Sequence, residues 1–477
     1  MAANGLITDL YQLTMANALF KKGMHERRVV FDRFYRKNPF NGGYTVVAGL
    51  AHLQEFAKNF RFDAEDIAYL KSLGIFYPEF LDYLADFHFT GDIYAMPEGT
   101  VAFPGELLLR FHGTTTEAML METGLSMIMN HESLIATKTR RVRTVAGKDA
   151  LMEFGLRRAQ GHSAGLWGAR AAMIGGFNGT SNVEAGKLFG IPVLGTMAHS
   201  WVQMFDSEYE AFKAYAQMYP NNAVLLVDTY NTLKSGVPNA IRAFNEVLKP
   251  LGITKCGIRF DSGDMAYLTR RARAMLDEAG WTECKITVSN SLDERLITEL
   301  MLQGAKIDSF GVGERLITAK SDPVFGGVYK LCAVEGEDGT IIPKIKISEN
   351  VGKITNPGFK KVYRFFEKEN GMAEADYICL ADENVDDTKP LEICDPEARW
   401  KRKTLENFTA QELLVPIFKH GELVYSLPSL DEIRRRCAYE VSTLWPEVKR
   451  FDFPHQYYVD LSEKLMELKD EMLKAKR

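Results

Sequence analysis

Several common sequence signals are missing from this chain of 477 residues. No run of 18 or more apolar residues occurs, and the N-terminal segment lacks a basic stretch followed by an apolar run, so neither membrane insertion nor secretion is expected. The formal net charge is -5, which argues against a broad nucleic-acid surface, because such surfaces need an excess of Lys and Arg. Any phosphate-bearing ligand should therefore be small and held locally.

Cysteine-based sites are missing as well. The cysteines show neither a C-x-x-C pair nor a Cys/His spacing that suits zinc, and we assign no metal held by the protein alone. They are interpreted as reduced thiols of a cytoplasmic protein. The six are Cys256, Cys284, Cys332, Cys379, Cys394 and Cys437.

Familiar nucleotide motifs are also missing. There is no G-x-x-x-x-G-K-[ST], so any ATP must be bound without a P-loop. Residues 310–315 lack the third glycine of a dinucleotide fingerprint, although a G-x-G turn there could still offer backbone N–H groups to a phosphate. Residues 225–232 superficially resemble the acidic phosphoribosyl-pyrophosphate loop of orotate and purine phosphoribosyltransferases, but the second acid and the closing Thr-Gly are missing.

The chain is long enough for two or three domains, and 46% hydrophobic residues can fill their cores. The first 120 residues or so mix helices and strands without a regular alternation. We expect helices at 9–22 and 48–60 and strands at 29–35 and 100–110. This part is predicted to be an α+β domain.

A regular alternation of strand and helix follows. Strand-like runs are expected at 191–195, 223–227, 256–260, 284–288, 307–312 and 328–334. Strand–helix repeats of about 25 to 30 residues predict parallel strands, in a barrel or a doubly wound sheet. The first five runs end in polar or glycine clusters, which in a parallel barrel share one mouth: Thr196 and His199; Asp228, Thr229 and Tyr230; Arg259, Asp261 and Ser262; Ser289 and Asn290; Gly311 and Gly313.

Local signals set the expected helix ends. Pro220 should stop the first helix of the alternating region, and Gly280 and Gly304 should follow the ends of the third and fourth. Residues 291–294 should open the fourth as a capping box. The last helix is expected at 458–475. Its apolar stripe is interpreted as a packing face, with a partner-binding face as the alternative; the stripe consists of Leu461, Leu465, Leu468 and Met472.

Two segments have anion-binding chemistry. Residues 153–161 place Phe154 beside Arg157 and Arg158, which suits a flat ring and a phosphate or carboxylate, although a surface salt-bridge site would look similar. The turn at 175–182 is rich in glycine and small donors and could cradle an anion, or simply connect two elements.

Two strand ends carry further candidates. His199 could act as a nucleophile toward a phosphoryl group or as an acid/base, or be structural. Residues 257–264 place Arg259 with Asp261 and Asp264, which could grip an anion and hold Mg²⁺ or steady charge on a sugar. An Arg/Asp ion pair beside a helix start is the alternative.

Seven segments taken in order resemble the nicotinate phosphoribosyltransferase family over nearly the whole chain. They are residues 8–15, 154–161, 176–182, 195–200, 226–230, 257–264 and 311–318. The resemblance implies an irregular TIM-like α/β barrel of the type II phosphoribosyltransferases. The expected domains are an N-terminal α+β domain at 1–125, the barrel at 126–345 and a small C-terminal domain at 346–477.

The resemblance also implies the activity. Nicotinate and phosphoribosyl pyrophosphate would give nicotinate mononucleotide and pyrophosphate, with Mg²⁺ and with coupled hydrolysis of ATP as co-substrate. This ligase-type reaction is the first step of NAD salvage from nicotinate. A homodimer with shared active sites is implied as well.

Site residues follow from the same resemblance. His199 would be phosphorylated by ATP, while Tyr11 from the partner subunit and Phe154 would sandwich the pyridine ring. Arg259 and Thr196 would meet the carboxylate, and Asp261 would lie near the ribose. The phosphate-binding groups would be Arg157 and Arg158, for phosphate or pyrophosphate, and Ser289, Asn290, Gly311 and Gly313, for the 5′-phosphate.

One residue departs from the pattern: Glu314 stands where a small hydroxyl residue is expected, and an acid there would repel phosphate. Two rival functions are a nicotinamide phosphoribosyltransferase, with Asp228 as the acid for the carboxamide, and a barrel protein that senses a nucleotide without catalysis.

Overall fold

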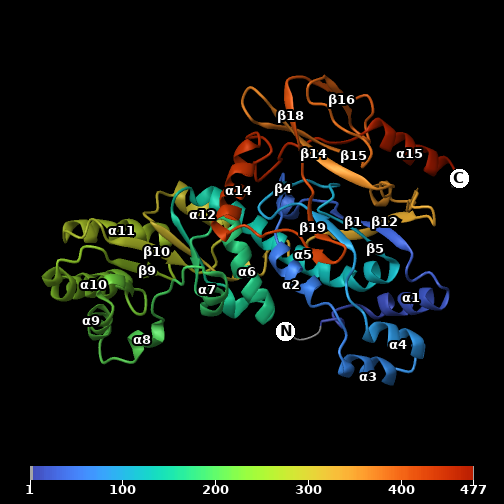
Figure 1. Ribbon diagram of the computed structural model, residues 1–477. Coiled ribbons are helices and arrows are strands. Elements are labelled where there is room, and N and C mark those ends of the chain that lie inside the picture. The colour runs from blue at the N-terminus through green and yellow to red at the C-terminus, as the bar shows by residue number, and fades with distance from the viewer. Residues whose placement is uncertain (1–3, 476–477) are drawn as a thin grey trace. The chain divides into compact units, whose positions relative to one another are not determined.

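The computed structural model describes residues 4–475, and its contacts divide the chain into two compact units (Figure 1). Unit 1 comprises Met1–Thr137 and Val324–Arg477, and unit 2 comprises Lys138–Pro323. The N-terminal and C-terminal segments thus share one unit, because β19 (Val415–Lys419) pairs with β3 (Asp92–Ala95). The three domain boundaries given above stay a prediction.

Unit 1 is built on an antiparallel sheet of seven strands. In sheet order these are β13 (Ile341–Pro343), β12 (Gly327–Glu335), β1 (Arg28–Tyr35), β5 (Leu109–Thr114), β3, β19 and β20 (Glu422–Leu423). Its helices are α1 (Leu10–Lys21), α2 (Leu50–Lys58), α3 (Ala64–Ser72), α4 (Pro78–Ala85), α14 (Leu430–Thr443), α15 (Glu463–Lys474) and most of α5 (Thr115–Ala146).

A second sheet of unit 1 belongs to the C-terminal part of the chain. Its order is β18 (Phe408–Glu412), β14 (Lys360–Glu367), β15 (Ala373–Leu380) and β21 (Val459–Leu461). Alternate residues of the strands face a core that contains Phe365, Tyr377 and Phe408. Two short pairs, β2 (Thr45–Val46) with β4 (Val101–Ala102) and β16 (Leu391–Cys394) with β17 (Arg402–Leu405), complete the unit.

Unit 2 is a parallel α/β unit. Its sheet order is β7 (Gly179–Thr180), β6 (Ala150–Glu153), β11 (Ser309–Val312), β10 (Lys285–Ser289), β9 (Gly257–Phe260) and β8 (Val224–Leu226). Helices alternate with these strands, as Figure 1 shows for α10 and α11 beside β9 and β10. They are α6 (His162–Gly175), α7 (Val183–Phe189), α8 (His199–Gln203), α9 (Glu208–Met218), α10 (Val237–Ala243), α11 (Met265–Glu278), α12 (Glu294–Leu302) and α13 (Glu314–Ile317).

The predicted strand–helix alternation is confirmed for β8 to β11, and the run at 328–334 is confirmed as a strand, although it lies outside the parallel sheet; the run at 191–195 was wrong. Residues 328–334 form β12, which pairs antiparallel with β1 in unit 1. Residues 191–195 contribute only a bridge between Thr180 and Val193. Two further parallel strands, β6 and β7, were not foreseen, because both are short and lie outside the regular alternation.

Three helix or strand boundaries also differ from expectation. The N-cap of α12 is Asp293, whose side chain accepts from Leu296 N, whereas Ser291 has a left-handed backbone. The last helix starts at Glu463, since Leu461 already belongs to β21. Residues 100–110 form the short β4 and the first residues of β5 rather than one strand.

Candidate active site

The carboxyl ends of the parallel strands in unit 2 carry most of the predicted site residues. Parallel strands present these ends at one edge of the sheet, where α/β barrels place their active sites. Thr196 lies just before α8, whose first residue is His199, and most of the other predicted residues lie at or just after strand ends. Five follow strands: Phe154 after β6, Asp228 after β8, Asp261 after β9, Asn290 after β10 and Gly313 after β11. Three more are among the last two residues of their strands: Arg259, Ser289 and Gly311.

His199 is held by a buried carboxylate. Its Nε2 lies 3.1 Å from Oδ1 of Asp228, whose side chain is 1% exposed, whereas the imidazole itself is 38% exposed. The other oxygen, Oδ2, accepts hydrogen bonds from the backbone N–H of Asp261 at 2.8 Å and from Oγ of Ser262 at 2.7 Å. A carboxylate at this distance favours the imidazole with a proton on Nε2, which directs Nδ1 away from Asp228.

Asp228 thus ties the end of β8 to the loop after β9. Sequence reasoning placed it in the ring of polar strand ends but gave it a role only in the rival nicotinamide function. Its position directly after an apolar strand was the available signal. The partner His199 lies 29 residues away along the chain, and nothing in the sequence pairs the two.

Arg259 is a largely buried cation without an ionic partner. Its Nη1 donates to Oγ1 of Thr196, its Nε has no hydrogen-bond partner, and it forms no ion pair with any residue of the described part of the chain. Burial lowers the pKa of the Arg259 guanidinium, while the charges of Asp261 and Asp228 act in the opposite direction. A guanidinium in this state can accept an anionic ligand without first breaking an ion pair.

The loop after β10 contacts the loop after β9. Oγ of Ser289 donates to Oδ1 of Asp261, and Nδ2 of Asn290 donates to the carbonyl of Asp261 at 2.9 Å. The backbone of Asn290 has φ +83°, and that of Ser291 has φ +53°. Left-handed non-glycine residues are concentrated at functional sites, where the surrounding contacts hold them.

The aromatic ring of Phe154 packs directly on Gly311. A Cβ atom at Gly311 would lie 2.5 Å from the ring, and one at Gly313 would lie 2.9 Å from the carbonyl oxygen of Phe154. Any larger residue at position 311 or 313 would collide with Phe154, so the close packing of the segment after β6 requires glycine at both positions. Their role as a phosphate cup stays a prediction.

Arg157 and Arg158 lie in the short 3-10 turn Leu156–Arg158, and both side chains are exposed. Neither forms an ion pair with another residue of 4–475. Glu314, the residue that departs from the pattern, pairs with Lys320 at 2.9 Å. The hydrogen bond from Lys320 lowers the pKa of the Glu314 carboxyl, so its charge is balanced within unit 2.

Tyr11 belongs to unit 1, on α1, and its side chain is 51% exposed. Its hydroxyl accepts a hydrogen bond from Nε2 of Gln12 at 2.8 Å. Leu10 and Met15 are exposed on the same short helix, as are Leu6 and Ile7 just before it. The structure thus presents Tyr11 within an apolar surface of unit 1.

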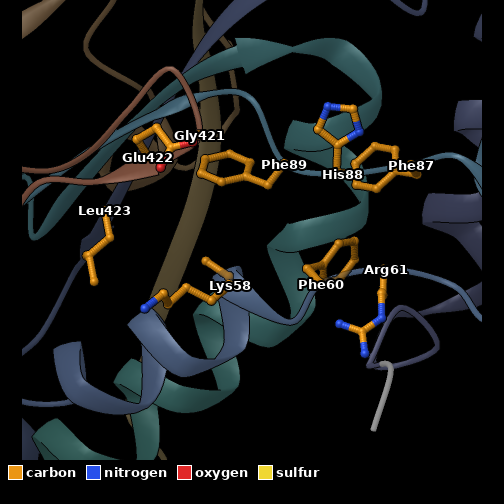
Figure 2. Close-up of a pocket in the computed structure, with 10 residues that line it drawn as sticks. Lys58, Phe60, Arg61, Phe87, His88, Phe89, Gly421, Glu422 and Leu423 are labelled. Carbon is orange, nitrogen blue, oxygen red and sulfur yellow. The ribbon is translucent and has the colours of Figure 1, made fainter. Parts of the chain in front are cut away.

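Unit 1 also contains a hollow of about 440 Å³, shown in Figure 2. Rings of Phe60 and Phe89 point toward it, and Lys58 and the hairpin residues Gly421 and Glu422 border it. None of the predicted site residues is among those that line it. The residues that line this hollow are thus no part of the predicted site.

Three family models match consecutive parts of the chain. They describe the nicotinate phosphoribosyltransferase N-terminal domain at residues 6–130, the nicotinate phosphoribosyltransferase family at 150–361 and the C-terminal domain at 359–469. A nicotinate phosphoribosyltransferase of Bacillus subtilis (strain 168) is 48% identical over 460 residues, which are 96% of this chain and 93% of that protein. The chain belongs to the nicotinate phosphoribosyltransferase family.

Further relatives agree with this assignment. The human nicotinate phosphoribosyltransferase is 34% identical over 98% of this chain and 96% of its own length. A crystal structure of human nicotinic acid phosphoribosyltransferase superposes with a TM-score of 0.86 at 32% identity, covering 98% of this chain and 99% of that one. The predicted type II phosphoribosyltransferase fold is confirmed. Within residues 4–475, moreover, no helix has the length and apolarity needed to span a bilayer.

Proposed function

We propose that this chain transfers the phosphoribosyl group of phosphoribosyl pyrophosphate to the ring nitrogen of nicotinate, forming nicotinate mononucleotide and pyrophosphate, with hydrolysis of ATP coupled to the transfer. The observation that carries the substrate assignment is Arg259, a largely buried guanidinium with an unpartnered Nε and no ion pair in the described chain. Nicotinate brings the carboxylate that this cation lacks, and Thr196 supplies a hydroxyl beside it.

Asp228 favours nicotinate over nicotinamide. An amide-selective site needs a carboxylate oxygen that is free to accept from the carboxamide NH₂. Both oxygens of Asp228 already accept, Oδ1 from His199 and Oδ2 from Asp261 N and Ser262. Since a carboxylate has about four acceptor positions, donors of the protein already use three of those of Asp228, which leaves little capacity for the carboxamide that the rival function requires.

The remaining strand-end groups suit the transfer chemistry. Phe154, with Tyr11 of the partner subunit, would sandwich the pyridine ring. Bond breaking at the anomeric carbon develops positive charge on the ribose, which the nearby carboxylate of Asp261 would stabilise. The pyrophosphate leaving group and the 5′-phosphate both need hydrogen-bond donors. Those proposed are Arg157, Arg158, Ser289, Asn290, Gly311 and Gly313.

Magnesium fits this site as an ion that enters with its substrate. Among residues 4–475 no three His, Cys, Asp or Glu side chains cluster as metal ligands. Asp261 and Asp264 offer carboxylates in the loop after β9, although Asp264 also caps α11 through Tyr267 N at 2.9 Å. Mg²⁺ is commonly held by one or two carboxylates together with phosphate oxygens, and it would neutralise the pyrophosphate here.

His199 is proposed as the residue through which ATP acts. Its imidazole would take the γ-phosphoryl group, ADP would leave, and hydrolysis of the phosphohistidine would complete the coupling. Asp228 supports this role because it holds Nε2 and stabilises positive charge on the ring. His199 is not proposed to attack the sugar.

A homodimer is the proposed assembly, with Tyr11 delivered to the site of the neighbouring subunit. Its exposed apolar surroundings, which include Leu10 and Met15, suit an interface with a second copy. The cytoplasm is the proposed compartment, since the six cysteines are buried thiols.

One assay tests the function. The protein is incubated with nicotinate, phosphoribosyl pyrophosphate and Mg²⁺, with and without ATP, and nicotinate mononucleotide and ADP are quantified. We expect product in both cases, with a higher rate and yield when ATP is present. His199→Ala should retain ATP-independent turnover and lose the stimulation; an unchanged stimulation would remove the proposed role of His199. A protein that makes no nicotinate mononucleotide under either condition would contradict the function.

A further inference from the structure

Glu153 is a buried carboxylate with no cationic partner. It is the last residue of β6 and lies in register between Val312 of β11 and Thr180 of β7. Its side chain is buried, and it forms no ion pair with Lys, Arg or His in the described part of the chain. A carboxylate in such surroundings must be held by neutral hydrogen-bond donors.

Two donors from different loops meet this carboxylate. Oε1 accepts from the backbone N–H of Gly155, and Oε2 accepts from Oγ1 of Thr180 at 2.6 Å. Thr180 donates its only hydroxyl proton to Glu153, and the Oγ1 atom of Thr180 also accepts from the N–H of Asn182 at 3.0 Å. One side chain therefore joins the turn after β6 to the turn after β7.

The contacts of Glu153 fix the backbone on both sides of Phe154. The N–H of Phe154 donates to the carbonyl of Val312 at 2.9 Å, and the next N–H, that of Gly155, is held by Glu153. A Cβ atom at Gly155 would lie 2.6 Å from Ile317, so this turn has no space in which to shift toward α13. From this backbone the ring of Phe154 packs against Gly311.

The arginine turn begins at the same point. The N–H of Arg158 donates to the carbonyl of Gly155 at 2.7 Å, which starts the 3-10 turn that carries Arg157 and Arg158. A displacement of Gly155 would thus move the aromatic ring and both guanidinium groups together. Loss of the Glu153 contacts should therefore affect more than one substrate.

We infer that Glu153 is a positioning residue for substrate binding: by accepting from Gly155 N and Thr180 Oγ1, it sets the place of the Phe154 ring and of the arginine turn. This inference rests on the proposed function, which assigns Phe154 to the pyridine ring and the arginines to phosphate groups. Glu153 itself is buried, so the proposed role is exerted through these residues and not by contact with a substrate. Groups that support binding residues in this way decide their geometry.

The hydrogen bonds of Glu153, rather than a negative charge, are the expected requirement. Burial raises the pKa of the Glu153 carboxyl, while the hydrogen bonds from Thr180 and Gly155 act to lower it. A glutamine can keep a hydrogen bond to each partner, because its amide oxygen can accept from Gly155 N and its NH₂ group can donate to the Thr180 oxygen, whose own proton then loses its acceptor. Alanine can satisfy neither.

The test compares Glu153→Gln and Glu153→Ala in the complete protein, with KM values for nicotinate and phosphoribosyl pyrophosphate as the readout. We expect Glu153→Ala to raise both KM values at least about tenfold, since displacements of about 1 Å have effects of this size or larger. Glu153→Gln should stay within about threefold of the wild type. The matched control is Asp308→Ala at the opposite end of the sheet, where Asp308 accepts from Ile286 N at 2.9 Å; it should lower stability and leave both KM values unchanged.

A second pair keeps the inference testable if Glu153→Ala does not fold. Thr180→Val removes one donor to Glu153, and Thr180→Ser keeps it, so only the valine variant should raise the KM values. An active wild type whose KM values are unchanged in Glu153→Ala, or in Thr180→Val, would overturn the inference. A wild type that makes no nicotinate mononucleotide would instead contradict the proposed function, independently of these variants.

Discussion

Two buried clusters of the molecule, the one around Arg364 in unit 1 and the strand ends of unit 2, use charge differently. In the sheets of unit 1, Arg364 is fully buried and donates to both oxygens of Asp376, to Glu440 and to the carbonyl of Val101. Lys360 pairs in the same unit with buried Asp32 at 2.8 Å. These cations have carboxylate partners, which leaves little capacity for a ligand.

The strand ends of unit 2 show the opposite arrangement. Asp228 and Glu153 are buried carboxylates that accept from backbone N–H groups, hydroxyls and an imidazole, and Arg259 keeps its charge without a carboxylate within ion-pair distance. The carboxylates of Asp228 and Glu153 thus bind neutral donors and an imidazole, and the guanidinium of Arg259 stays without a carboxylate partner. The same residue types form ion pairs around Arg364, so what distinguishes the anion-binding site is that its cation is left unpaired.

The largest effect expected from this comparison is on stability. Arg364→Met should lower the free energy of unfolding by about 3–5 kcal/mol, because Asp376 and Glu440 would remain buried without their cation. Denaturant unfolding measures the loss. The same substitution at Arg402, whose exposed side chain pairs with Glu392, should leave the unfolding midpoint unchanged. Equal midpoints for the two variants would remove the structural role of Arg364.

The same substitution in unit 2 should act on catalysis. Arg259→Met removes a cation that has no ion pair to lose, so stability should change little, while kcat/KM for nicotinate should fall about 100-fold, or about 2–3 kcal/mol. Steady-state kinetics gives kcat/KM for nicotinate, and denaturant unfolding of the same preparation gives the free energy of unfolding. If unfolding were affected as strongly as in Arg364→Met and kcat/KM were retained, Arg259 would be a structural cation and the comparison would fail.

A smaller effect is expected at Asp460, a buried carboxylate of the edge strand β21 that has no cationic partner in the described chain. Burial, followed by the charge of Asp395, raises its pKa to about 6. The folded protein then binds a proton more tightly than the unfolded chain, whose aspartates titrate near 4, so stability falls as the pH rises between about 4 and 6.

Asp460→Asn should remove this part of the pH dependence. At pH 7.5 we expect the variant to gain about 1 kcal/mol in the free energy of unfolding, and at pH 4 no difference from the wild type. Thermal or denaturant unfolding at both pH values measures it. A loss of stability at pH 7.5 would show that Asp460 has a favourable partner when ionised.

The sequence was informative where the signal is local. The alternation of apolar runs and helices located β8 to β11, and the polar residues after each run located the site. Asp228, Arg259 and Ser289 all follow or end such runs. A shared strand direction is enough to bring them to one edge, so no long-range contact had to be known.

The rest depended on contacts that no local pattern carries. The run at 328–334 is a strand, but only its antiparallel partner β1 shows that it belongs to unit 1. Ser291 and Asp293 can both cap a helix, and the left-handed backbone at Ser291 decides in favour of Asp293. Likewise, Asp228 becomes important only through His199, 29 residues before it.

The central claim is that the strand ends of unit 2 select an anionic pyridine, and a competition assay tests it most directly. Wild-type protein is given nicotinate and nicotinamide together at equal concentration, with phosphoribosyl pyrophosphate, Mg²⁺ and ATP, and the two mononucleotides are separated and quantified. Since Arg259 offers a guanidinium without an ion pair and both oxygens of Asp228 already accept from the protein, nicotinate mononucleotide should be nearly the sole product. Equal amounts of the two products, or an excess of the amide, would contradict the account.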